Sequence, residues 1–427
     1  MLIIKIIKKE SSAKLVILAV CFLMEFLCLG FCSSTGGLYL VPVTEALDIQ
    51  RSLYSITTSI RYIVQVFVAF YFGPLARKFG IKKLVLAGLS ALFGSMLIRA
   101  YATNIIHIYI AGALLGLGVV LSGGTMAGTI IRRWFDQDVG KYTGIVMSAN
   151  GIGGAIAVQI ISPIINTGEK FAYQNGYKLS ALIVLLFSIV IIMFLKDPPS
   201  APDYIPVKGK KKPRGMLWQG LEFTEVKRKP YFYLAVIMVF TTGISLQSIS
   251  GITIAHMTDV GLSAKAVAAM ATISSMILTV SKFFVGYLYD KRGLRITFII
   301  CHMATVLAFA LKAILTDSTL GIVIAVIATA LTSLALPLET VMLPLIANDL
   351  FGTASYDKVL GILMAMNSLG LCLGSPLGNI YYDLFGTYVP CFWLFVILMV
   401  IVTVGWQLTL TRANRDKETI LNCQENE

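Results

Sequence analysis

The sequence contains few charged residues. Asp, Glu, Lys and Arg together make up 13% of its 427 residues, whereas a soluble domain has about 25%. Hydrophobic residues make up 57% of the chain, and the mean hydropathy is +0.82. This composition excludes an ordinary soluble domain and predicts a protein with many membrane-spanning segments.

Cysteine and histidine are few and scattered. The seven cysteines form no Cys-x-x-Cys pair, which argues against a disulfide scaffold. The three histidines, His107, His256 and His302, form no i, i+4 pair, and the chain contains no nucleophilic triad or phosphate-binding loop. The sequence therefore predicts no catalytic residues, no metal site and no cofactor, and hence a protein that is not an enzyme.

Long apolar segments account for most of the chain. Windows of about 20 residues identify twelve of them. They lie near residues 15–40, 54–73, 84–101, 105–131, 141–165, 177–195, 231–256, 266–289, 296–315, 320–346, 358–381 and 388–411. The first is too long for a signal peptide and is interpreted as a retained span. The predicted fold class is an all-α membrane protein with twelve transmembrane helices.

The positive charge is distributed unevenly between alternate loops. Most of the 35 Lys and Arg residues lie in the N-terminal tail and in loops that would share one side of a membrane. Cytoplasmic loops carry such an excess, so both termini are predicted to be cytoplasmic in a multi-pass protein of the cell membrane. The opposite side would carry Arg51, Arg99, Lys170, Lys178, Lys265 and Lys312. This bias explains most of the net charge of +13, and no nucleic-acid partner is expected.

A short motif occurs twice. Residues 73–80 and 286–293 both begin and end with glycine, lie 213 residues apart, and each separates two apolar segments. Two similar six-helix bundles in tandem are typical of transporters that hold a substrate near the middle of the bilayer. We therefore expect two pseudo-symmetric bundles.

The twelve segments divide the chain into four regions. These are an N-terminal six-helix bundle (1–196), a cytoplasmic basic linker (197–230), a C-terminal six-helix bundle (231–411) and a cytoplasmic tail (412–427). The basic run at 208–214 either contacts anionic lipid head groups or is a solvated linker. A monomer is expected.

The architecture and one loop resemble the major facilitator superfamily. The loop reads Gly286-Tyr-Leu-Tyr-Asp290-Lys-Arg-Gly293-Leu-Arg295, and it is similar to the Gly-x-x-x-Asp-x-x-Gly loop that recurs after segments two and eight of that family. The earlier copy has Arg77 in place of the usual Asp. The resemblance implies that Asp290 and Arg295 form a conformational latch, in which the carboxylate accepts hydrogen bonds from a helix N-terminus or from Arg.

Three further stretches, at 38–43, 132–144 and 344–352, resemble the oxalate/formate antiporter and monocarboxylate transporter group. This resemblance implies a secondary transporter that moves a small organic anion by alternating access, by proton coupling or by anion exchange. Asn367 stands where the oxalate carriers have Lys, so we expect a monocarboxylate. Gly123 and Gly124 replace bulkier residues and predict a wider pocket. The alternative is a superfamily efflux pump for a hydrophobic or cationic compound.

Four ionisable residues lie within the predicted spans: Glu25, Arg61, Lys282 and Glu339. A charge at the bilayer centre costs at least about 2.5–3.5 kcal/mol, which makes such residues candidates for function. Lys282 lies about 12 Å along its helix from Asp290. Its position resembles that of a basic residue which pairs with the substrate carboxylate in the carrier group.

Each of these candidates has an alternative role. Lys282 either contacts the substrate or forms an ion pair with Glu339, which could also accept a proton. Glu25 and Arg61 either form a structural ion pair, or Arg61 is a second substrate cation.

Three polar residues complete the candidate substrate site. They are Tyr39, Asn150 and Asn367, and each either contacts the substrate or bonds to a neighbouring helix. Besides the substrate, the expected partners are protons and membrane lipids.

Overall fold

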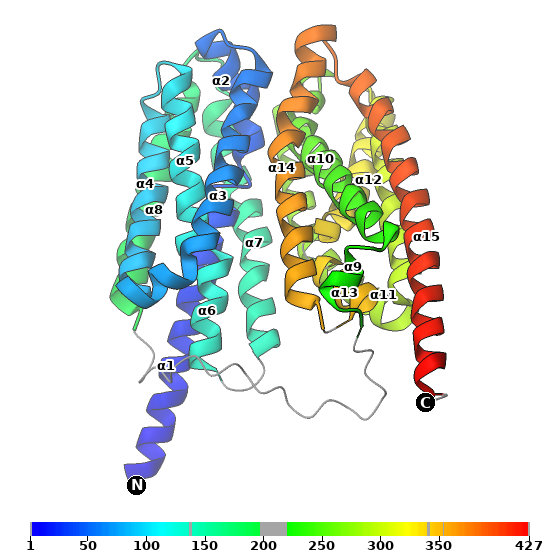
Figure 1. Ribbon diagram of the computed structural model, residues 1–427. Helices are drawn as coiled ribbons and strands as arrows, with labels where there is room; N and C mark the ends of the chain where they lie inside the picture. Colours follow the sequence, from blue (N-terminus) through cyan, green and yellow to red (C-terminus); the bar gives the residue numbers. More distant parts are fainter. Residues whose placement is uncertain (1, 136–138, 197–219, 340–341, 353, 426–427) are drawn as a thin grey trace. The chain divides into compact units, whose positions relative to one another are not determined.

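The computed structural model describes residues 2–135, 139–196, 220–339, 342–352 and 354–425, with the backbone alone at 2–12, 139–141, 339, 357 and 420–425. The described residues form helices and no strands. The chain forms two compact units, one of Met1–Val207 with Ser263–Met276 and the other of Lys208–Leu262 with Ile277–Glu427 (Figure 1). The predicted linker lies outside the described residues up to position 219.

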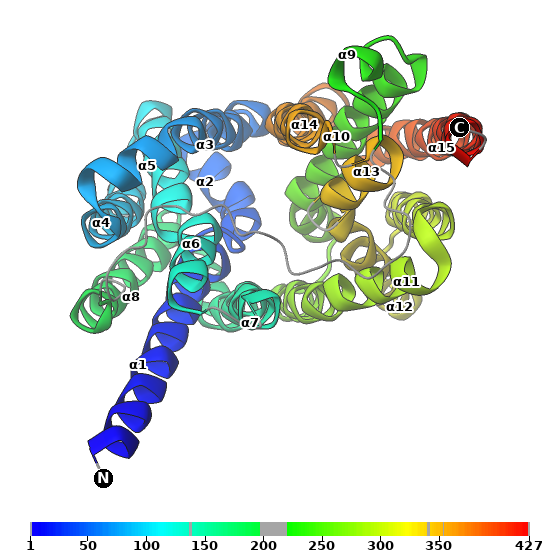
Figure 2. The same ribbon diagram turned by 60° about the horizontal axis from the view of Figure 1, so that its bottom comes forward.

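The first unit begins with an interrupted helix. Its elements are α1 (Leu2–Glu25), the π-helix η1 (Phe26–Phe31), the 3₁₀-helix η2 (Gly36–Tyr39), α2 (Leu40–Leu47), α3 (Arg51–Phe79), α4 (Ile81–Ala100), α5 (Ile105–Ser122), α6 (Gly124–Trp134), α7 (Val139–Ile165) and α8 (Ala172–Phe194). Helix α4 packs between α5 and α8, which lie beside it in both ribbon views (Figures 1 and 2).

The second unit contains the longest helices. Its elements are α9 (Phe223–Val226), α10 (Pro230–Asp259), α11 (Ala264–Ala313), α12 (Thr319–Ala335), the 3₁₀-helix η3 (Leu336–Glu339), α13 (Met342–Phe351), α14 (Tyr356–Phe385) and α15 (Val389–Glu425). The first residues of α11 belong to the first unit. Helix α10 packs against both α14 and α15.

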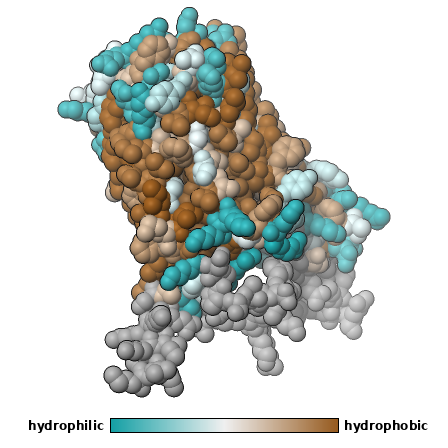
Figure 3. Space-filling view, turned by 90° about the vertical axis from the view of Figure 1, so that its left-hand side faces the viewer, coloured by the Kyte–Doolittle hydropathy of each residue, from teal (hydrophilic) through white to brown (hydrophobic). Residues whose placement is uncertain are grey.

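The described residues contain eleven helices that are long and apolar enough to cross a membrane. One of them, α11, has 50 residues and bends at Gly293, where φ is 73°. A straight helix of that length would measure about 75 Å, whereas the hydrocarbon core is about 30 Å thick. Helix α11 therefore supplies two spans, and the predicted twelve-helix membrane fold is confirmed. The face drawn in Figure 3 shows the corresponding hydrophobic band with hydrophilic residues at both ends.

The two units repeat one plan with the offset found in the sequence. Helices α3 and α11 begin at Arg51 and Ala264, which are 213 residues apart. Gly80 and Gly293 have the same separation and nearly the same positive φ, 78° and 73°. Only glycine adopts this conformation without strain, so the two glycines turn the chain into the next helix in the same way.

The glycines of the eleventh predicted segment lie at a tight helix contact. A Cβ atom on Gly370 would lie 2.4 Å from the backbone oxygen of Phe240, and one on Gly374 would lie 2.6 Å from that of Ile244. Both contacts join α14 to α10. Such close backbone approach supplies much of the association energy between helices in lipid.

Candidate substrate-binding site

The first membrane span changes its helix type in the middle. Helix α1 ends at Glu25, the π-helix η1 follows, and the 3₁₀-helix η2 precedes α2. Irregular backbone at membrane depth is tolerated only where protein buries it or where it lines a cavity. Interrupted helices are also typical of binding sites in transporters, and π-helical turns often occur at functional sites. The middle of this span is therefore a candidate site.

Glu25 is buried at the start of this interruption. Its Oε2 atom lies 3.5 Å from the position that a Cβ atom on Gly124 would take, and the Met147 side chain lies even closer to that position. A Cβ atom on Gly123 would lie 3.1 Å from Sγ of Cys28. The room left by the two glycines is thus filled by neighbouring side chains. The wider pocket that the sequence predicted at these glycines is not what the first unit shows.

Asn150 faces the interrupted span from α7. The Ser34 hydroxyl lies 3.3 Å from Oδ1 of Asn150 and 2.8 Å from the backbone oxygen of Leu29. A Cβ atom on Gly30 would lie 2.7 Å from Cα of Gly153, so η1 packs directly on α7. Asn150 therefore bonds to a neighbouring helix, and it is half-buried. Contact with a substrate stays a prediction.

Arg61 lies on α3 and is half-buried. Its guanidinium carbon lies 5.3 Å from the centre of the Tyr62 ring. A Cβ atom on Gly116 would lie 2.5 Å from the Arg61 backbone oxygen, so α5 holds this part of α3 closely. The ion pair with Glu25 and the role as a substrate cation both stay predictions.

Tyr39 belongs to a buried aromatic cluster. It is 1% exposed, and its ring stacks on Tyr177 with 3.8 Å between ring centres. The Tyr177 hydroxyl lies 3.4 Å from the Tyr54 hydroxyl and accepts a hydrogen bond from Nη1 of Arg99 at 3.4 Å. This packing favours the alternative in which Tyr39 contacts a neighbouring helix. Arg99, which the sequence placed on the outer side, is only 4% exposed.

Replacing Tyr177 with Phe should destabilise the protein. The substitution keeps the stacked ring but removes the oxygen that accepts the bond from the buried Arg99. An unsatisfied buried donor costs about 1–3 kcal/mol, and more where it is charged. Thermal unfolding of purified protein would show a lower midpoint. Tyr101→Phe, at an exposed tyrosine, is the matched control and should leave the midpoint unchanged; equal midpoints for both variants would contradict the prediction.

Lys282 lies at the edge of the buried face of α11. It is half-buried, between the buried Ser281 and the exposed Phe283. The side chain of Glu339, its suggested ion-pair partner, lies outside the described residues. The choice between substrate contact and ion pair therefore stays open.

Asn367 lies on the buried face of α14. It lines a small cavity in the second unit together with Thr242 and His302. The Nε2 atom of His302 is buried and has no hydrogen-bond partner among the described residues. A neutral polar cavity, and not a second cation, therefore occupies this part of the unit.

The predicted latch residues lie on either side of the bend in α11. Asp290 and Arg295 are both exposed. Nε of Arg295 donates a hydrogen bond of 2.9 Å to Oε1 of Gln407 on α15, so Arg295 connects two helices of the same unit. The latch role of Asp290 stays a prediction.

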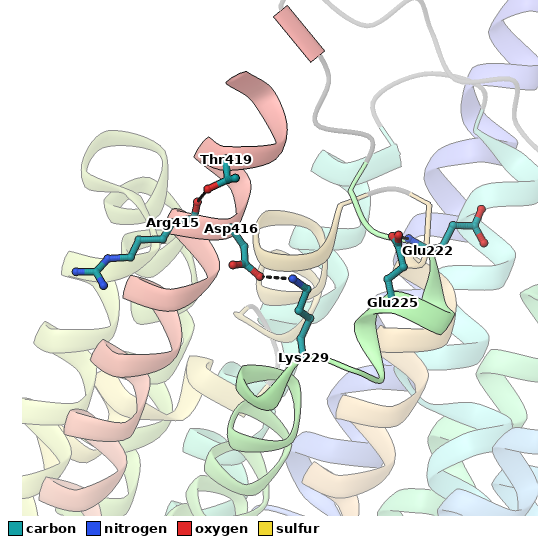
Figure 4. Close-up of polar contacts among 6 residues, drawn as sticks. All are labelled: Glu222, Glu225, Lys229, Arg415, Asp416 and Thr419. Carbon is teal, nitrogen blue, oxygen red and sulfur yellow. Dashed lines mark hydrogen bonds and ion pairs between the residues drawn. The ribbon is translucent and has the colours of Figure 1, made fainter. Parts of the chain in front are cut away.

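Ion pairs join helix ends at the same end of the second unit. Lys229, which precedes α10, lies 2.6 Å from Asp416 of α15, and Figure 4 shows the two side chains pointing toward each other. Lys417 of α15 lies 3.8 Å from Asp349 of α13. These contacts attach the extension of α15 to α10 and α13.

The sequence analysis missed a buried cation in the second unit. Lys312, in the last turn of α11, is 1% exposed. Its Nζ atom donates hydrogen bonds to Oγ1 of Thr253 at 2.6 Å and of Thr332 at 2.9 Å. The available signal was the repeat, because Lys312 lies 213 residues after Arg99.

Comparison with known proteins identifies the family. The model of the Major Facilitator Superfamily matches residues 21–329 and 235–422, which together cover most of the chain. The chain belongs to the Major Facilitator Superfamily. It is therefore a membrane transporter of a small molecule and not an enzyme, as the sequence predicted.

Individual members of the superfamily are similar over different lengths. Monocarboxylate transporter 13 of Rattus norvegicus is 26% identical over 363 residues, covering 83% of this chain and 79% of that protein. The sialic acid transporter NanX of Escherichia coli (strain K12) is 23% identical over 257 residues, and the match spans only 59% of its length. The crystal structure of the nucleoside transporter NupG has a TM-score of 0.75 at 15% identity, covering 93% of this chain and 99% of that one. This last likeness concerns the fold alone.

Proposed function

We propose that this superfamily member is a secondary transporter of organic monocarboxylates that works by alternating access. The observation that carries the proposal is Lys282, a basic side chain half-buried in the apolar helix α11. Ionisable side chains within spans are rare, costly, and commonly mark the path of a substrate or ion. An ammonium group in such surroundings is suited to bind a carboxylate by charge-assisted hydrogen bonds.

The named relatives support an anionic substrate. Monocarboxylate transporter 13 and the sialic acid transporter NanX are named for compounds that carry a carboxylate group. The proposed contacts in the second unit are Lys282 and Asn367. In the first unit they are Arg61 and Asn150, with Tyr39 acting through the aromatic cluster.

A single carboxylate is favoured over two. The position at which the resembled oxalate carriers have a second cation holds Asn367, which is buried beside Thr242 and His302. An amide offers hydrogen bonds but no charge. A dicarboxylate would therefore leave one of its charges without a cation in this unit.

The remaining parts of the proposal concern coupling and placement. Transport is coupled either to protons or to exchange of a second anion, and Glu25 and Glu339 are the candidate acidic groups. The protein acts as a monomer in the cell membrane, with both termini in the cytoplasm and lipid around it.

Counterflow in proteoliposomes tests the substrate class. Vesicles that contain purified protein are loaded with one unlabelled compound, and entry of a labelled monocarboxylate is measured. Monocarboxylates inside should accelerate entry, whereas their amides, which have the same shape but no charge, should not. Dicarboxylates should have a weaker effect. Acceleration by lipophilic cations together with no effect of carboxylates would contradict the proposal and favour the efflux alternative.

A further inference from the structure

We propose that Lys312, with Thr253 and Thr332, is a proton-binding site that takes up and releases a proton during transport. This site lies apart from Lys282 on the same helix. The inference rests on the proposed function in one respect, namely that the protein is a coupled transporter.

The hydrogen bonds around Lys312 account for two N–H groups. The Thr332 hydroxyl donates its only hydrogen to the backbone oxygen of Ala328, and the Thr253 hydroxyl donates its own to that of Ile249. Both hydroxyls therefore only accept from Nζ of Lys312. A neutral amine has two N–H groups and an ammonium group has three. The described contacts match the neutral amine, and a third N–H would need an acceptor that this arrangement does not provide.

The groups that face Lys312 do not include a carboxylate paired with it. From α10, Nε2 of His256 bonds to the Lys312 backbone oxygen at 2.8 Å, and Asp259 ends the same helix. Helix α12 contributes the hydroxyl of Thr332. The residue that follows the 384–387 loop, Tyr388, lies edge-on to the His256 ring at 6.1 Å. Among the described residues Lys312 makes no ion pair, so its charge is balanced only when a proton leaves.

Comparison of the two repeats separates this role from simple packing. Arg99 and Lys312 occupy equivalent positions, in the last turns of helices that both begin after a positive-φ glycine. Each is buried and bonds to hydroxyl groups of neighbouring helices. Arg does not lose its proton in proteins, whereas a buried Lys can. The fold thus holds a permanent cation in one unit and a titratable one at the same place in the other.

Protonation of Lys312 would change the packing of its unit. The third N–H and the added charge favour any arrangement that gives Nζ another acceptor or water. A ligand shifts a conformational equilibrium by its difference in affinity for the two states, and a proton on Lys312 has this property. The site therefore provides a means to couple a proton to the movement of the carrier.

The test compares Lys312→Arg with Lys265→Arg. The second variant makes the same change at an exposed lysine near the start of α11. Labelled substrate exchange at equal pH and net uptake driven by a pH gradient are both measured in proteoliposomes. We expect Lys312→Arg to retain exchange within about twofold and to lose the acceleration by the pH gradient, whereas Lys265→Arg retains both. A wild-type response to the gradient in Lys312→Arg, or no response in the wild-type protein, would overturn the proposal.

A second measurement does not depend on transport. Thermal unfolding of purified protein is followed from pH 6 to pH 9 for the wild type, Lys312→Met and Lys312→Arg. Stability depends on pH wherever the folded and unfolded states bind different numbers of protons. We expect both variants to lose a part of the pH dependence that Lys265→Met retains. Identical pH profiles in all proteins would reject the proton site and leave the monocarboxylate proposal intact, whereas failure of every carboxylate in counterflow would reject only the latter.

Discussion

Lys282→Ala should abolish substrate uptake while leaving the protein folded. Removing one member of a hydrogen-bonded charge pair costs about 2–5 kcal/mol of binding, so uptake at a fixed substrate concentration should fall at least about 30-fold. The side chain is half-buried at the edge of its helix, and its loss leaves the helix contacts of α11 in place. Uptake into proteoliposomes and the elution profile of purified protein measure the two outcomes.

Two control variants separate charge from shape at this position. Lys282→Arg keeps the positive charge and should retain measurable uptake, although Arg places its charge in a planar group. Lys265→Ala removes an exposed lysine near the start of the same helix and should transport normally. Near-normal uptake by well-folded Lys282→Ala would rule out this residue as the substrate cation.

Gly370→Ala should strongly destabilise the second unit. The added Cβ would lie 2.4 Å from the backbone oxygen of Phe240 and 3.0 Å from the backbone nitrogen of Ile244. Backbone atoms of α10 cannot rotate aside as a side chain would, so α10 and α14 must separate. Overpacking of this kind typically costs about 1–3 kcal/mol. The expected result is a lower unfolding midpoint and a smaller yield of folded protein.

The matched control for this substitution lies on the same helix. Gly361 has no atom within 4 Å of the position that a Cβ would take. Gly361→Ala should therefore be neutral, or should stabilise the helix by about 0.5–1 kcal/mol, because alanine loses less backbone freedom on folding. If both alanine variants unfold at the same temperature, the close contact of Gly370 does not contribute to stability.

The architecture could be predicted because its causes lie in the local sequence. Hydrophobic length determines where a helix can cross a membrane, and a repeated Gly-rich turn shows that one unit occurs twice. Gly80 and Gly293 illustrate this, since both occupy a positive-φ position that the spacing alone identified. The count of eleven long helices arises because α11 continues through Gly293.

The candidate site could be predicted less completely. Charge within an apolar segment identified Glu25 and Lys282 directly. The same rule missed Arg99 and Lys312, because each lies near the end of its segment, where a cation normally reaches the membrane surface. Neighbouring helices instead supply Tyr177 to Arg99, and Thr253 and Thr332 to Lys312.

The sequence by itself determined the class of this protein, its membrane spans, its repeat and its candidate substrate cation. These properties depend on residue type and spacing along one segment. The tertiary structure alone decided which polar groups are buried, which glycines admit another backbone, and which hydroxyls surround Arg99 and Lys312. Those properties depend on atoms from helices far apart in the chain, and the cost of burying a charge is known only when its partners are known.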